Sequence, residues 1–298
     1  MLKLTRYADA AQYYARAESF WMRHEAAHCL SIGITNSLIQ TRTQYGQEPP
    51  YLAVVEDDAG QIVLTVMRTP PRGLILSLCD QPAVLDAVVE DVLNAYDSLP
   101  KVVGEAKLAR RFAERWAART GAGHHLEMPE RIYQVSQVRL PVGVPGALRR
   151  ATPADRELVI DWIVAFEVEA FGAQETSRER LGVFADAGIG ENHAGMAFVI
   201  RGFYLWDDPA NGGAVSLVGH SGPTPNGMRI GPVYTPPEKR GHGYASAATA
   251  EVSRLLLESG RKFCFLYTDL RNPTSNKIYQ QIGYEPVIDC GLYRFDAG

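Results

Sequence analysis

The sequence predicts an α/β protein with a mixed β-sheet, built from two successive halves that share one order of strands and helices. Three observations support this prediction. Short apolar runs rich in β-branched residues alternate with longer segments of helical period. The same series of elements occurs twice along the 298 residues. In the second half, a glycine-rich loop runs straight from an apolar strand into a helix.

The N-terminal half opens with a segment of helical period at residues 17–40. A hairpin follows, because two apolar runs flank the turn from Asp57 to Gly60. The strands and helices that we expect after the first helix are strands at 51–58, 61–69 and 73–79, a helix at 83–96, a strand at 101–106, a helix at 107–121 and a strand at 131–141.

The C-terminal half begins with a short strand near Gly146 and a helix with clear start signals. Thr152 is a good N-cap, Pro153 suits the first helical position, and Asp155 suits the first turn. The elements expected after this helix are a helix at 178–187, strands at 196–208, 214–222 and 228–235, a helix at 242–260, a strand at 262–270, a helix at 272–283 and the last strands at 284–296.

Composition and charge narrow the function classes. The net charge of −4 gives no electrostatic case for a nucleic acid or an anionic membrane as partner. The four cysteines are scattered without a C-x-x-C pair, so zinc ribbons and thioredoxin chemistry are not expected. The sequence has no run of about 18 apolar residues, so we expect no membrane span, and its N-terminus lacks the apolar core of a signal peptide. We therefore expect a cytoplasmic protein.

The loop from Arg240 to Ala245 has the form Arg-x-x-Gly-x-Ala and opens into a helix. Its glycines allow a tight turn and a close approach of the backbone to a ligand. Successive N–H groups at a helix start, together with the helix dipole, attract phosphate. The sequence therefore predicts a pyrophosphate site here. The corresponding loop of the first half, Asp80 to Pro82, has a carboxylate but no glycine or arginine, so we expect no such site there.

A second motif, NPTSNKIYQQIGY at Asn272 to Tyr284, follows the loop VYTPPEKRGHGYA after one helix and one strand. Together the two motifs resemble those of the GCN5-related N-acetyltransferase superfamily, which uses acetyl-CoA. The resemblance covers the C-terminal half closely and the first half weakly. It implies an acyl-CoA N-acyltransferase fold in two tandem domains. Residues 1–143 would form a degenerate domain and residues 144–298 the catalytic domain, joined at Pro141 to Gly146.

The resemblance also implies roles for individual residues. The backbone of the strand end would hold the pantetheine arm and the oxyanion, the loop would hold the pyrophosphate, and Asn272 would reach the pantetheine region. Tyr279 would be the general acid that protonates the leaving thiolate. The residues expected to bind acetyl-CoA are Val233, Tyr234, Thr235, Arg240, Gly241, His242, Gly243, Tyr244, Ala245, Ser246 and Asn272.

The acceptor would be a primary amine of a small molecule or a peptide, attacking the thioester directly in a ternary complex. Glu167 and Glu169 on the first helix of the C-terminal half are candidates for contact with the acceptor, and His220 is a candidate base. No charged residue follows Arg229 on the strand that precedes the loop, so the general base stays open.

Two alternatives remain at this point. The protein could bind CoA for regulation without turnover. It could also be a zinc hydrolase, because His24, Glu25 and His28 form the pattern H-E-x-x-H on an expected helix. We expect no metal, since the flanking pattern and the C-terminal motifs do not suit such an enzyme. A monomer and a homodimer are both compatible with the sequence.

Overall fold

The computed structural model describes residues 2–43, 45–173, 176–189 and 201–296. The chain divides into two compact units. Unit 1 comprises Met1–Tyr133, Tyr267–Pro273 and Pro286–Gly298, and unit 2 comprises Gln134–Leu266 and Thr274–Glu285. The first five residues of the strand expected at 196–208 lie outside the described residues.

Unit 1 contains a mixed sheet whose neighbouring strands follow the order β1-β2-β3-β4-β5-β12-β6. Strands β1 to β4 pair antiparallel, β4 and β5 pair parallel, and β12 pairs antiparallel with β5. The elements are β1 (Lys3–Arg6), α1 (Ala10–Trp21), α2 (Cys29–Gln40), β2 (Tyr51–Glu56), β3 (Ile62–Arg68), β4 (Leu74–Leu76), α3 (Leu85–Leu93), β5 (Lys101–Glu105), α4 (Ala106–Thr120), β6 (His124–Val135) and β12 (Glu285–Phe295).

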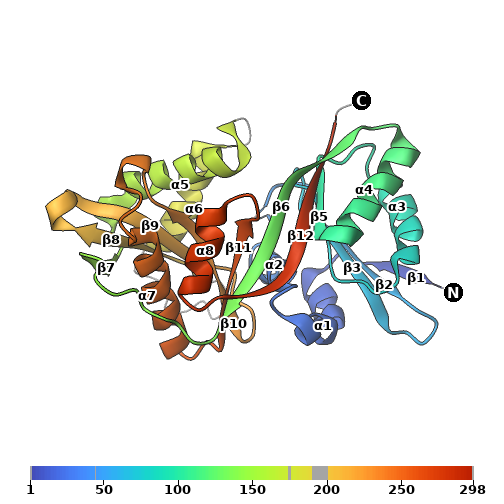
Figure 1. Ribbon diagram of the computed structural model, residues 1–298. Helices are drawn as coiled ribbons and strands as arrows, with labels where there is room; N and C mark the ends of the chain where they lie inside the picture. Colours follow the sequence, from blue (N-terminus) through green and yellow to red (C-terminus); the bar gives the residue numbers. More distant parts are fainter. Residues whose placement is uncertain (1, 44, 174–175, 190–200, 297–298) are drawn as a thin grey trace. The chain divides into compact units, whose positions relative to one another are not determined.

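Helices cover both faces of this sheet (Figure 1). Alternate residues of β2 show why its sequence is apolar throughout: Ala53 packs in the core that includes α3 and α4, whereas Val54 packs in the core of α1 and α2. Strands buried on both faces read as continuous apolar runs instead of alternating ones. The predicted strand 51–58 is therefore confirmed, and its pattern reports two layers of helices.

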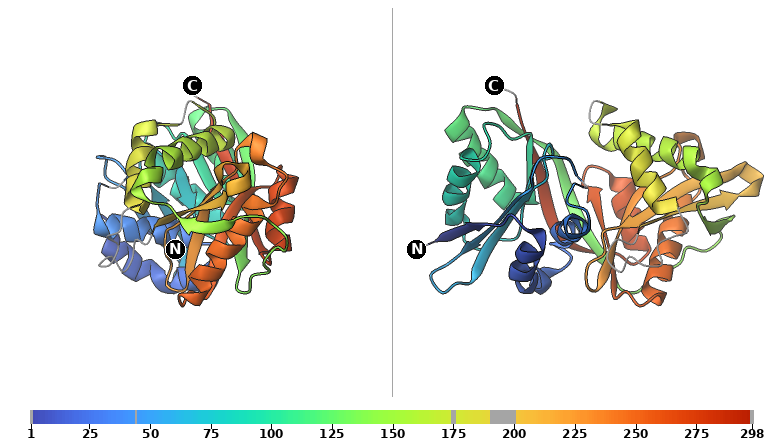
Figure 2. Two further views of the ribbon diagram at one scale, coloured as in Figure 1. Left: turned by 90° about the vertical axis from the view of Figure 1, so that its left-hand side faces the viewer. Right: turned by 180° about the vertical axis from the view of Figure 1, so that it is seen from behind.

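Unit 2 has the strand order β11-β10-β9-β8-β7, with β10 and β11 parallel and the other pairs antiparallel. Helices α5 and α6 lie on one face and α7 on the other (Figure 2). The elements are β7 (Ala147–Arg150), α5 (Arg156–Phe171), α6 (Arg178–Ile189), β8 (Gly202–Asp208), β9 (Gly213–Ser221), β10 (Gly227–Tyr234), α7 (Tyr244–Glu258), β11 (Phe263–Asp269) and α8 (Pro273–Gln281).

The expected helix start at Thr152 is confirmed as a capping box. The Thr152 N–H donates to the Asp155 carboxylate at 2.8 Å, and the Thr152 side chain bonds the backbone of the first turn in return. Pro153 begins the 3-10 turn Pro153–Asp155, which leads directly into α5 at Arg156. These local signals give α5 its starting point, and through it the position of the acidic residues further along the helix.

The repeated order of elements is confirmed, because β1-α1-α2-β2-β3-β4-α3-β5-α4-β6 matches β7-α5-α6-β8-β9-β10-α7-β11-α8-β12. The compact units nevertheless differ from the sequence halves. The last strand, β12, pairs with β5 in the registers Cys290↔Glu105 to Arg294↔Lys101, so it packs in unit 1. Among the described residues, no helix has the length and apolar character needed to cross a membrane.

The single helix expected at 17–40 is wrong. Helix α1 ends at Trp21, a short 3-10 turn covers Met22–His24, and α2 begins only at Cys29. The buried His28 ring explains the break, because its Nδ1 lies 3.0 Å from the carbonyl oxygen of Trp21. A side chain thus takes an acceptor at the end of α1, and the chain turns before α2 starts. Strand β1 was also not expected from the sequence.

Candidate functional site

Strands β10 and β11 form a fork in unit 2. Their parallel pairing runs from Gly227↔Phe263 to Arg229↔Phe265, whereas β10 continues to Tyr234. The register between β10 and β9 shifts between Ile230 and Val233, which marks a β-bulge at Gly231. Bulges interrupt pairing and re-aim a strand. In the described part of unit 2, β11 therefore pairs with the start of β10 but not with its end, where Val233 and Tyr234 lie.

The predicted phosphate loop follows β10 directly. A 3-10 turn at Pro237–Lys239 leads to Gly241 and Gly243, whose φ angles of +84° and +83° favour glycine. Helix α7 begins at Tyr244, and its first bond joins the N–H of Ala247 to the carbonyl of Gly243 at 3.0 Å. Within the described residues, no carbonyl or side chain accepts from the N–H groups of residues 241–246.

These six consecutive donors lie at the positive end of α7. A Cβ placed on Gly241 would meet no atom within 4 Å, so the space beside the loop is open. The structure therefore brings the loop residues together at a helix N-terminus, as the sequence predicted. This arrangement can bind a pyrophosphate through backbone N–H groups.

Arg240 contacts both the strand end and α5. Its Nε donates to the carbonyl of Thr235 at 2.9 Å, and its Nη2 lies 2.8 Å from each carboxylate oxygen of Glu169. The guanidinium is also 5.9 Å from the Tyr234 ring centroid. The Arg240 and Glu169 side chains are each about half exposed, so their ion pair is screened and weak. A residue expected at the cofactor thus pairs with one expected at the acceptor.

The other two acceptor candidates lie elsewhere in unit 2. Glu167 forms an ion pair with Arg180 at 3.2 Å. His220 is buried near the end of β9, opposite Gly202 on β8. A Cβ on Gly202 would lie 2.6 Å from His220 Nε2, so the histidine ring packs against β8. Glu167 and Glu169 thus pair with two different arginines, Arg180 and Arg240.

Tyr279 is buried on α8, with its ring 6.0 Å from that of Tyr284. Burial raises the pKa of Tyr279 to about 12, because removal from water disfavours the phenolate. The hydroxyl is therefore protonated at neutral pH, which is the state that a general acid requires. Asn272 is exposed and directly precedes α8 in the chain, and its N–H donates to the carbonyl of Asp269 at 3.0 Å. Asn272 belongs to unit 1 and Tyr279 to unit 2.

Two features of the structure escaped the sequence reading. The side chain of Tyr244 is buried and bonds Asp208, although only the backbone of Tyr244 was assigned a role. On β6 in unit 1, burial and the nearby Asp269 carboxylate raise the pKa of Glu130 to about 7. Neither position carries a local sequence signal, since each depends on residues brought together by the fold.

The H-E-x-x-H pattern does not form a metal-binding helix face. His24 is exposed in the 3-10 turn, whereas His28 is buried. The Nδ1 of His28 bonds the Trp21 carbonyl, and its Nε2 accepts from the Leu78 N–H at 3.2 Å. Both ring nitrogens are thus used by the backbone. Over the described ranges, no three His, Cys, Asp or Glu side chains are grouped so as to hold a metal ion.

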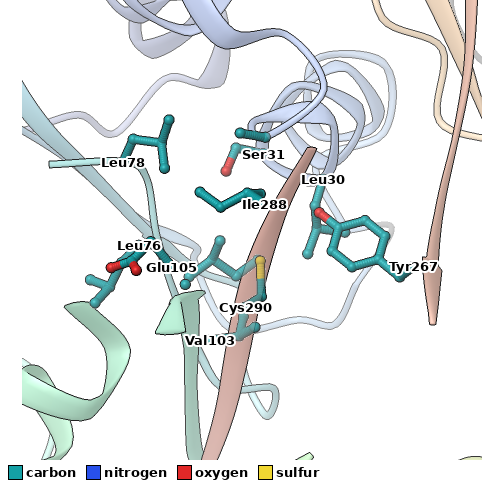
Figure 3. A pocket seen from close by; sticks show the side chains of 12 residues that line it. Leu30, Ser31, Leu76, Leu78, Val103, Glu105, Tyr267, Ile288 and Cys290 are labelled. Atoms are coloured by element: carbon teal, nitrogen blue, oxygen red, sulfur yellow. The ribbon is translucent and has the colours of Figure 1, made fainter. Parts of the chain in front are cut away.

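Unit 1 has a fork at the corresponding place. Strands β4 and β5 pair in parallel at Leu74↔Val102 and Ile75↔Val103. Beyond these pairs lies a small cavity lined mainly by apolar side chains (Figure 3). Its walls come from α2, the ends of β4 and β5, β12 and Tyr267, and include Leu30, Leu78 and Ile288 with the carboxylate of Glu105.

Comparisons with known proteins agree with this geometry. Residues 216–291 match the family model described as FR47-like protein. No curated protein matches the sequence. A Drosophila protein of solved structure is 11% identical, with a TM-score of 0.67 over 98% of each chain.

Two further solved structures are similar over nearly their whole length. A GCN5-related N-acetyltransferase from Sphaerobacter thermophilus is 15% identical, with a TM-score of 0.60 over 98% of this chain and 95% of that one. A tandem GNAT protein from the clavulanic acid biosynthesis pathway is 13% identical, with a TM-score of 0.53 over 99% and 98%. At such low identities, the likenesses establish the fold.

Proposed function

Because the chain has the tandem fold of the GCN5-related N-acetyltransferase superfamily, we propose that it is an acetyl-CoA-dependent N-acetyltransferase whose cofactor binds to unit 2. One observation carries the proposal. Six consecutive N–H groups, from Gly241 to Ser246, lie at the start of α7 directly after the bulged strand β10. A pyrophosphate is the ligand class that such a loop suits best.

The proposed roles divide between the loop and the strand. The N–H groups of the loop bind the pyrophosphate, and Arg240 adds a positive charge at its head. The backbone of Val233 and Thr235 pairs with the pantetheine amides as an added strand does at a sheet edge. A backbone N–H near Tyr234 stabilises developing negative charge on the reacting carbonyl. Asn272 is assigned to the pantetheine region.

Tyr279 is the proposed general acid. Acetyl-CoA supplies a thioester, whose sulfur needs a proton as the C–S bond breaks. The raised pKa of Tyr279 keeps its hydroxyl available as the donor at neutral pH. The acceptor is a primary amine of a small molecule or a peptide, which attacks in a ternary complex. The general base is left unassigned.

The acidic residues of α5 that could attract an amine acceptor already have partners. Three acidic residues of this helix each pair with an arginine: Asp161 with Arg178, Glu167 with Arg180 and Glu169 with Arg240. Arg178 also pairs with Glu157 of α5. Each of the three carboxylates thus has an arginine partner, with which a cationic amine would compete. We also propose a cytoplasmic monomer or homodimer.

Calorimetric titration with acetyl-CoA tests the proposal. The wild-type protein is expected to bind at micromolar concentration, and the double variant Arg240→Ala, Gly243→Asp is expected to lose binding, since it removes a cation and places a carboxylate in the loop. Release of free thiol with a panel of primary amines then tests turnover. Absence of binding by the wild type contradicts the proposal. Binding without turnover across the panel favours the alternative of a non-catalytic CoA-binding protein.

A further inference from the structure

We infer that the side chains of Asp208, Asn211 and Tyr244 position the phosphate loop and thereby set the affinity for acetyl-CoA. These residues, with Lys239, are called the loop clamp below. The inference rests on the proposed function, because it assigns positioning residues to the same cofactor site. All four residues belong to unit 2.

The centre of the loop clamp is a buried hydrogen bond. Asp208 ends β8, Tyr244 begins α7, and each side chain is 2% exposed. The Tyr244 hydroxyl donates to Asp208 Oδ2 at 2.6 Å. A short bond between a hydroxyl and a carboxylate is stronger than one between neutral groups. The first residue of α7 is therefore fixed to the end of β8, a strand that is paired on both sides.

Asn211 connects this bond to the other end of the loop. Its Nδ2 donates to Asp208 Oδ2 at 2.8 Å and to the Tyr244 hydroxyl at 3.1 Å. The backbone carbonyl oxygen of Asn211 accepts from Lys239 Nζ at 2.7 Å. Lys239 precedes the phosphate loop and Tyr244 follows Gly243, so one short turn, Pro209–Asn211, holds both ends of the loop.

The loop needs such external support because its own sequence supplies little. Gly241 and Gly243 carry no side chains, and glycine has the largest backbone entropy to lose. Helix α7 has glycine as its N-cap and no side-chain capping bond. Donors that are already in position bind an anion without paying for ordering at the moment of binding. The loop clamp is the part of unit 2 that provides this order.

The charges in the clamp favour the same arrangement. Hydrogen bonds from Tyr244 and Asn211 lower the pKa of Asp208, and the bond to Asp208 raises the pKa of Tyr244. At neutral pH the carboxylate is ionised and the hydroxyl holds its proton, so the bond keeps its direction. Asp208 also uses its second oxygen, Oδ1, which accepts from the Ala210 N–H at 3.1 Å.

The test compares two variants that each remove one buried tyrosine hydroxyl. Tyr244 lies on α7 itself, and the Tyr284 hydroxyl bonds a residue of α7. Tyr244→Phe removes the clamp bond. Tyr284→Phe is the matched control, because the Tyr284 hydroxyl shares a 2.8 Å hydrogen bond with Ser253 further along α7 and is also 2% exposed. Kd for acetyl-CoA by calorimetry, Tm, kcat and KM are measured for both variants and for the wild type.

Tyr244→Phe is expected to raise Kd and KM for acetyl-CoA about 10-fold, with kcat at saturation within about two-fold of wild type. Tyr284→Phe is expected to lower Tm comparably and to change Kd by less than about two-fold. Asn211→Ala, at an exposed residue outside the loop, is expected to raise Kd about three-fold. This second clamp variant keeps the test valid if Tyr244→Phe does not fold. A clamp that only stabilises the fold would not separate KM from kcat in this way.

Two results overturn the inference while leaving the proposed function intact. In one, wild type and both clamp variants bind acetyl-CoA equally. In the other, Tyr284→Phe loses as much affinity as Tyr244→Phe. A wild-type protein that does not bind acetyl-CoA contradicts the proposed function itself, and the inference falls with it.

Discussion

The two forks of parallel strands, β4 with β5 and β10 with β11, occupy the same place in the repeated order of elements but differ in the loop that follows. In unit 2 the loop presents six backbone donors at a helix start. In unit 1, Pro82 has no N–H, the N–H of Gln81 points to the Cys79 sulfur at 3.4 Å, and Asp80 adds a negative charge. The proposed binding of pyrophosphate to unit 2 thus rests on the loop and not on the shared fold.

The space beside the two forks differs as well. Unit 1 has a small apolar cavity with aliphatic side chains from α2, β4 and β12 (Figure 3). In unit 2, the corresponding strand β10 ends in Tyr234, beside the ion pair of Arg240 and Glu169. The fork of unit 1 is therefore lined mainly by apolar side chains, with the Glu105 carboxylate among them, whereas the fork of unit 2 ends beside an arginine and a glutamate. Three experiments test this contrast between the units.

The largest expected effect is on the free energy of unfolding and involves His28 in unit 1. His28 is neutral in the fold, and burial lowers its pKa from 6.5 to about 4. As the pH falls below 6.5, the unfolded chain takes up a proton that the folded chain does not. The free energy of unfolding should therefore fall between pH 6.5 and 4, by up to about 3 kcal/mol from this residue. Urea titrations across this range measure the slope.

Two variants isolate that contribution. His28→Gln should flatten the dependence of unfolding free energy on pH, whatever its effect at pH 7. His24→Gln, at the exposed histidine of the same segment, should change the dependence much less, because burial of His28 lowers its pKa more than the nearby His24 does. Equal slopes in wild type and His28→Gln would show that His28 does not govern the acid stability of unit 1.

The second experiment separates the catalytic capacity of the two units. Helix α8 carries the buried Tyr279, whereas the corresponding helix α4 buries Phe112 and Trp116 and contains no tyrosine. Tyr279→Phe should lower kcat about 100-fold, since loss of a general acid costs roughly that much, while Kd for acetyl-CoA stays within about two-fold. An unchanged kcat at every pH would remove Tyr279 from the mechanism. Tyr284→Phe serves again as the control for a lost buried hydroxyl.

The contrast between the units also shows what a sequence can predict here. The hairpin at β2 and β3, the capping box at Thr152 and the loop at Gly241 were predicted because turn, cap and glycine signals act over a few residues. The break before His28 was missed, since helical period alone does not show that the His28 ring is buried, with Nδ1 at the Trp21 carbonyl and Nε2 at the distant Leu78 N–H. The pairing of β12 with β5 likewise joins residues about 190 positions apart.

The candidate site divides in the same way. Motif spacing predicted the phosphate loop and Tyr279 as site residues, and they lie within about 40 residues of each other. The bond between Tyr244 and Asp208 and the ion pair between Arg240 and Glu169 join separate elements, whose partners are 36 and 71 positions apart in the sequence. Neither pair has a local pattern, so only the fold reveals them.

The smallest expected effect comes from that ion pair, and its sign is informative. If Arg240 serves the cofactor, its bond to Glu169 competes with phosphate. Glu169→Gln should then lower Kd for acetyl-CoA, by no more than about five-fold, because exposed ion pairs contribute about 0–1 kcal/mol. The gain should shrink at high salt, where the pair is already screened.

Glu167→Gln is the matched control, because Glu167 pairs with Arg180 instead of the loop arginine and should leave Kd for acetyl-CoA unchanged. A weaker affinity for acetyl-CoA in Glu169→Gln would mean that Glu169 holds Arg240 in its binding position and does not compete with the phosphate. A raised KM for the amine, with the cofactor affinity unchanged, would instead place Glu169 at the acceptor. Each of these outcomes gives Glu169 a different role. Unit 1 has no corresponding ion pair to test, since no arginine precedes Asp80 in its loop.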